Sequence, residues 1–104
     1  NDDRPGEARV LSCLATVELR LSRYGPAADH LKQAVTLFRQ FGHRAGEARA
    51  LTDLGDIHTR LGRPEQAAEH HQRALELFRD IGDRDSATVA LNGLGQAYED
   101  LGKT

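Results

Sequence analysis

The chain has 104 residues, a length that suits one domain built around a single core. Its 14 basic and 16 acidic side chains give a formal net charge of −2, which excludes the strongly basic character typical of a nucleic-acid-binding domain. No apolar run reaches the roughly 20 residues that cross a membrane, and the one cysteine, Cys13, cannot form a disulfide within the chain. We therefore expect a cytoplasmic segment that contacts neither nucleic acid nor membrane.

The sequence repeats with a period of 40 residues. Residues 2–41 align with residues 42–81 without a gap, and 17 of the 40 aligned positions are identical. Residues 82–104 begin a third copy and stop about halfway through it. A period of this length is typical of stacked helical units that each need a neighbour to bury their apolar face. We expect one domain over residues 1–104, with repeat one at 2–41, repeat two at 42–81 and a half repeat at 82–104, cut from a longer array.

Five helices are predicted in chain order, over residues 5–21, 25–41, 45–61, 64–81 and 84–101. Each follows a 3–4 spacing of apolar residues, as in the stripe of repeat two formed by Leu51, Leu54, His58 and Leu61. Gly62 and Gly82 suit left-handed turns after a helix, and Asp83 suits the N-cap of the last one. The connections are short, so neighbouring helices are predicted to be antiparallel.

Small residues at fixed places identify a family resemblance. Leu51, Leu54, Gly55, Ala67 and Ala74 resemble the tetratricopeptide repeat pattern. Repeat one supplies Leu11, Leu14, Ala15, Ala27, Leu31 and Ala34, and the half repeat supplies Leu91, Leu94, Gly95 and Tyr98. This resemblance implies an all-α, right-handed superhelical stack of antiparallel helix hairpins, with about two and a half repeats and five helices. It also implies that small residues at positions 15, 55 and 95 let paired helices approach closely. The 40-residue variety resembles the arrays of bacterial SARP-type transcriptional regulators and of related signalling NTPases.

The histidines do not form a convincing metal site. His58 and His71 are expected to be partly buried between helices, whereas His30 and His70 are expected to be solvated. No nucleophile, base and orienting group recur at a usable spacing. We therefore predict no metal, no cofactor and no enzymatic activity, and leave Gly93 without an explanation.

The best candidate site is the concave face, which the first helix of each repeat lines in such stacks. A protein or peptide partner is predicted to bind polar side chains left free there; these are Arg9, Ser12, Thr16, Arg49, Thr52, Asp53, Asp56, Asn92 and Gln96. Cys13, Val89 and Gly93 lie on the same face. The Lys and Asn residues with which some tetratricopeptide domains clamp a C-terminal carboxylate are replaced here, and Asp53 would repel such a group.

A second interpretation gives the segment no separate ligand. The last predicted helix lacks a partner helix, so Leu91, Leu94, Tyr98 and Leu101 are expected to expose an apolar flank. Exposed flanks of this kind favour self-association. Under this interpretation the segment is a structural spacer or a homodimerisation element.

Overall fold

The computed structural model describes residues 4–102, and over this range the chain is all-α. The helices are α1 (Arg4–Arg20), α2 (Tyr24–Gln40), α3 (Arg44–Arg60), α4 (Pro64–Ile81) and α5 (Arg84–Gly102). The predicted fold class is confirmed, and each helix boundary lies within one residue of its predicted place. The first residues of repeat one and the last two of the half repeat lie outside the described residues.

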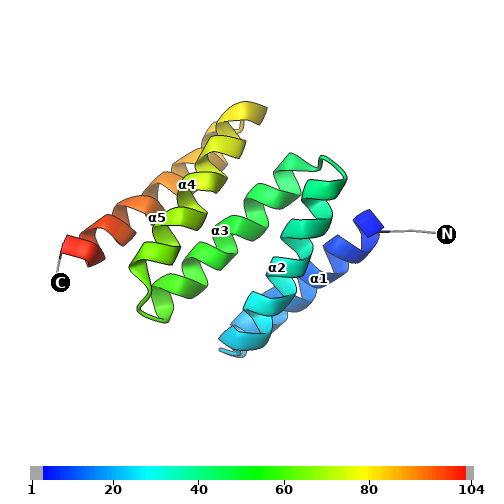
Figure 1. Ribbon diagram of the computed structural model, residues 1–104, viewed down its shortest axis with the longest axis horizontal. Helices are drawn as coiled ribbons and strands as arrows, with labels where there is room; N and C mark the ends of the chain where they lie inside the picture. The colour runs from blue at the N-terminus through cyan, green and yellow to red at the C-terminus, as the bar shows by residue number, and fades with distance from the viewer. Residues whose placement is uncertain (1–3, 103–104) are drawn as a thin grey trace.

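The helices form an elongated stack of antiparallel neighbours, as Figure 1 shows. Each helix packs on the next one along the chain, and α3 also contacts α5. The stack measures 50 × 32 × 18 Å, with α1 and α5 at opposite ends. The contact between α3 and α5 brings the first helices of successive repeats onto one side of the molecule.

All four turns between helices close in the same way. The residue just before each following helix donates its backbone N–H to the carbonyl five positions earlier, at N···O distances of 2.8 to 2.9 Å; these residues are Arg23, His43, Arg63 and Asp83. The residue directly before each of these donors has a left-handed backbone conformation, with φ of +68°, +70° and +76° at Gly42, Gly62 and Gly82. This is the hydrogen-bonded glycine turn expected after a helix. In the first turn Ser22 takes the same conformation, with φ of +58°.

Two helices have side-chain N-caps from equivalent positions of the repeat. Asp83 Oδ1 accepts from Ser86 N at 3.1 Å, as predicted, and hydrogen bonds from the side chain and then the backbone of Ser86 lower the pKa of the Asp83 carboxyl. His43 holds the corresponding place before α3, where its Nδ1 accepts from Gly46 N at 3.0 Å. The imidazole thus satisfies a free N–H of the first turn in place of a carboxylate.

The core runs along the stack between facing helices. It consists largely of alanines and leucines, including Ala27, Leu31, Ala48, Leu54, Ile57, Ala74 and Leu94. The small side chains of Ala15, Ala27 and Ala67 are fully buried, which allows the close approach that the sequence predicts. His58 and His71 are buried between helices, as expected.

His71 lies in a slot made by two glycines. A Cβ atom added at Gly55 of α3 would stand 2.6 Å from the ring, and one added at Gly93 of α5 would stand 2.5 Å from it. The ring therefore fills the place of two absent side chains, and this explains Gly93. Gly95, to which we assigned a packing role, has no atom within 4 Å of such a Cβ. That assignment was wrong because no described helix covers this face of α5.

His30 and His70, expected to be solvated, are half-buried, with part of each side chain exposed. They occupy equivalent positions, and each contacts the first helix of its own repeat. His30 Nδ1 lies 2.6 Å from Glu18 Oε1, whereas the His70 ring stacks on that of His58 with centroids 5.0 Å apart. Glu18 and His58 are also repeat equivalents. The same interhelical contact is therefore a histidine–carboxylate hydrogen bond in repeat one and a stacked histidine pair in repeat two.

Glu47 joins three helices. Its carboxylate, on α3, is 5 % exposed and accepts from Arg39 Nε of α2 at 3.0 Å. Arg73 Nη2 of α4 lies 3.8 Å from the same oxygen. The carboxylate thus links the second helices of two successive repeats through the first helix between them.

Candidate groove between the first helices

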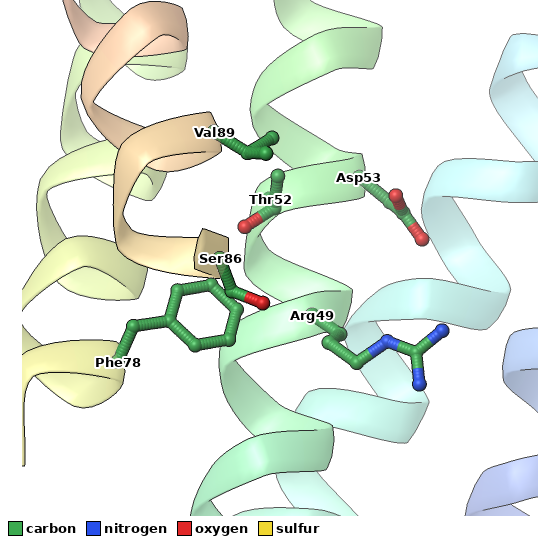
Figure 2. A pocket seen from close by; sticks show the side chains of 6 residues that line it. All are labelled: Arg49, Thr52, Asp53, Phe78, Ser86 and Val89. Carbon is green, nitrogen blue, oxygen red and sulfur yellow. The ribbon is translucent and has the colours of Figure 1, made fainter. Parts of the chain in front are cut away.

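Two neighbouring cavities lie on the side of the stack formed by α1, α3 and α5. The larger, about 310 Å³, lies between α1 and α3, and the smaller, about 190 Å³, lies between α3 and α5. Arg49 and Asp53 of α3 line both cavities, so the two form one groove with a shared wall. Figure 2 shows Arg49 and Asp53 extending from α3 on the side away from Ser86 and Val89.

Six of the nine predicted site residues line this groove. Arg9, Ser12 and Thr16 line the larger cavity, together with the exposed Cys13. Thr52 lines the smaller one, and Arg49 and Asp53 line both. The remaining three, Asp56, Asn92 and Gln96, line neither cavity. Gln96 instead donates to Asp100 at 2.9 Å on its own helix.

The floor of the groove was missed at the sequence level. Phe38 lines the larger cavity and Phe78 the smaller one, and both rings come from the ends of second helices. Both rings are 3 % exposed and belong to the core as well. His43, in the turn before α3, and Ser86, in the first turn of α5, complete the rims. The common signal of the two phenylalanines is position, since Phe38 and Phe78 lie one period apart.

A third hollow of about 320 Å³ lies at the turn between α4 and α5. Phe78 borders it as well, and Arg79, Asp83 and Arg84 supply its polar lining. It contains none of the predicted site residues. We therefore treat it as a surface hollow at the end of the α4–α5 hairpin rather than as part of the groove.

The shared wall carries an unusual carboxyl group. Burial, reinforced by the neighbouring charge of Asp56 and opposed by Arg49, raises the pKa of Asp53 to about 6. Burial also raises the pKa of Asp56, against the opposing effects of His71 and Arg60. His71 Nε2 lies 3.6 Å from Asp56 Oδ1, and burial lowers the pKa of that imidazole. The groove therefore contains a carboxyl that changes charge close to neutral pH.

Comparison with known proteins supplies the family. A family model described as Tetratricopeptide repeat matches residues 46–104, more than half of the chain. The chain belongs to the tetratricopeptide repeat family. The search of curated proteins gives no match.

Tetratricopeptide repeats generally mediate protein–protein interactions and are typically not enzymes. Among residues 4–102 no helix is long and apolar enough to cross a membrane. In the same range, His, Cys, Asp and Glu side chains do not gather in threes as a metal site would need. In this tetratricopeptide chain the candidate groove formed by α1, α3 and α5 has an aromatic floor, two arginines and several hydroxyl groups along its lining.

Proposed function

We propose that this segment binds a peptide, or an extended segment of a partner protein, in the groove between α1, α3 and α5. The observation that carries the proposal is the pair of adjoining cavities that share Arg49 and Asp53. Each cavity has the size of one or two side chains rather than of a complete small ligand. Apolar floors with hydroxyl and charged rims suit a peptide chain that places successive side chains into them.

The wider setting is proposed from the resemblance of the repeats. The 40-residue period is similar to that of arrays in bacterial SARP-type regulators and signalling NTPases. We propose a cytoplasmic regulatory protein in which this segment recruits a partner without contacting nucleic acid, membrane or a cofactor.

The test uses the single cysteine as a blocking site. A displayed library of random peptides is selected on the immobilised chain, and the selected peptides are measured by fluorescence anisotropy. Cys13 is exposed and lines the larger cavity, so alkylation with a bulky maleimide is expected to abolish binding. Cys13→Ser, treated in the same way, is expected to keep it. Failure to select any peptide, or peptides that bind equally well after alkylation, would contradict the proposal.

A substitution pair then maps the site. Arg49→Ala is expected to weaken binding by about tenfold or more without changing the melting temperature, because its guanidinium forms no ion pair within residues 4–102. Asn92→Ala, which removes an exposed side chain that lines neither cavity, is the matched comparison. Equal losses for the two variants would place the binding surface across the whole concave face instead.

A self-associating segment is the alternative function. On α5, Leu91 and Tyr98 are exposed, the latter by 58 %, but Leu94 is buried against the stack and does not belong to this flank. Under this alternative, light scattering would show a dimer whose fraction rises with concentration, and Tyr98→Lys would abolish it. A monomer at every concentration would exclude it.

A further inference from the structure

The two cavities of the groove are copies of one another. The smaller is lined by Arg49, Thr52, Asp53, Phe78, Ser86 and Val89. Each of these lies 40 residues after a residue of the larger cavity, namely Arg9, Ser12, Cys13, Phe38, Gly46 and Arg49. The repeat has therefore produced two equivalent subsites, each with an arginine, a hydroxyl group and a phenylalanine floor.

Two substitutions between the copies give the subsites different charge. Where the larger subsite has Arg49 as its second cation, the smaller has Val89, and where the larger has Cys13, the smaller has Asp53. The larger subsite thus has a guanidinium from α1 and another from α3. Asp53 lines both subsites, so the larger has two arginines beside this carboxyl, whereas the smaller has one arginine beside it and an apolar wall.

Neither arginine of the larger subsite forms an ion pair among the described residues, although the charge of Arg49 lowers the pKa of Asp53 on the same helix. Within residues 4–102 the arginines in ion pairs are Arg39 and Arg73, both on Glu47. Arg9 and Arg49 are exposed and make no such contact. Two guanidinium groups facing one cavity can bind a carboxylate through short, charge-assisted hydrogen bonds.

From this asymmetry we propose that the groove recognises an extended peptide by an acidic side chain held between Arg9 and Arg49, with an uncharged side chain in the second subsite against Val89. The proposal rests on the groove being a peptide site. Helix axes in contact lie roughly 8–10 Å apart, and an extended chain advances about 3.3 Å per residue. The two anchoring side chains then stand about three residues apart.

Asp53 couples this recognition to pH. On its own helix, Asp53 lies near Asp56 and Arg49. Across the larger cavity it faces Arg9 of α1 and His43 of the α2–α3 turn. Across the smaller cavity it faces only uncharged side chains of α4 and α5. An acidic ligand would be repelled by ionised Asp53 but not by the protonated form. Binding should therefore tighten as the pH falls from 7.5 to about 5.5. Asp53→Asn should remove most of this dependence, whereas a dependence that arises from His43 would remain.

The experiment uses the peptides selected above. In each one, Glu or Asp is replaced by Gln or Asn, and affinity is measured for the natural chain, Arg9→Gln, Arg49→Gln and Arg23→Gln. Arg23 is an exposed residue just before α2 and lines neither cavity, so Arg23→Gln is the control that removes the same charge elsewhere. The acidic peptide is expected to lose about tenfold or more upon amide replacement. The unchanged acidic peptide should lose as much affinity for Arg9→Gln. Combining the amide peptide with Arg9→Gln should cost little more affinity than either change alone.

The possible results separate the two proposals. Peptides that are blocked by Cys13 alkylation but tolerate amide replacement, or bind Arg9→Gln and Arg23→Gln equally, would overturn the acidic preference and leave the groove as a peptide site. If no peptide is selected, both proposals fail. Loss of the acidic preference in Arg9→Gln, with Arg23→Gln unchanged, would establish the acidic subsite.

Discussion

At the scale of single residues, the glycines of α5 show how differently two identical residues can be used. Gly93 faces the buried His71 ring, which is 1 % exposed, whereas Gly95 faces open space. The ring cannot move away from Gly93, because Gly55 closes the other side of the slot. One glycine is therefore required by packing, and the other only weakens its helix.

We predict opposite effects for the same substitution at these two positions. Gly93→Ala should lower the free energy of unfolding by about 1–3 kcal/mol, because the new methyl group overlaps the ring. Gly95→Ala should raise it by about 1 kcal/mol through helix propensity alone. Urea denaturation measures both. The slot would be refuted if the two variants shifted stability in the same direction.

The carboxyl of Asp53 predicts a pH-dependent stability. Its pKa is about 6 in the folded chain against an ordinary 3.8, so between these values the folded state holds the proton more tightly than the unfolded state. The free energy of unfolding must then fall as the pH rises from about 4 to 6. The difference between the two pKa values corresponds to a loss of at most roughly 3 kcal/mol in the free energy of unfolding at neutral pH.

Asp53→Asn should therefore raise stability at pH 7.5 by about 1–3 kcal/mol and change it little at pH 4. Asp29→Asn, at an exposed position of α2, is the matched control and should have no comparable pH dependence. Denaturation curves at the two pH values provide the measurement. A gain from Asp53→Asn that is equal at both pH values would mean that burial does not perturb this carboxyl.

The single-residue roles that the sequence predicted depend on what faces each residue. The burial of His58 and His71 followed from their place on the apolar stripe. The role of Gly93 did not, because the ring that faces it comes from α4, in another repeat. Gly95 matches the family pattern, yet the pattern states only where a small residue belongs and not whether a helix covers it.

At the scale of the helices and their turns, Ser22 is the exception in an otherwise uniform set. Every turn closes with the same hydrogen bond and places one residue in the left-handed region, which costs a residue other than glycine roughly 1 kcal/mol. Ser22→Gly should therefore raise the melting temperature, and Gly62→Ser, at the equivalent position, should lower it by a similar amount. Thermal denaturation of both variants checks this symmetry, and a fall with Ser22→Gly would contradict it.

The link between helices through Glu47 gives a further prediction. Glu47→Gln should lower the free energy of unfolding by about 1–2 kcal/mol, because it removes a charged acceptor that is shared by two arginines. The loss is limited because Arg39 and Arg73 are half exposed and regain water. Glu69→Gln, at an exposed position of α4, should change little. In high salt the difference between these variants should shrink; a difference that persists would reflect packing instead.

At the scale of the whole molecule, the period carried most of the prediction. It located the five helices, the turns and the side of the stack that holds the candidate groove. It did not locate Phe38 and Phe78 in the groove, because a residue on the core stripe can also form the floor of a cavity where the covering helices diverge. Asp56, Asn92 and Gln96 share the predicted side but not the cavities, since curvature between helices cannot be read from one helix alone.

The shared wall of the two cavities has a consequence for selectivity. The interval between the subsites is one repeat, and close-packed alanines and the His71 slot fix that interval, so it cannot adjust as a loop would. A ligand with suitable side chains at the wrong spacing could occupy only one subsite at a time, and it would lose the gain in effective concentration that a second anchor provides. Inserting a single residue between the anchors of a bound peptide should then be as damaging as removing one of them.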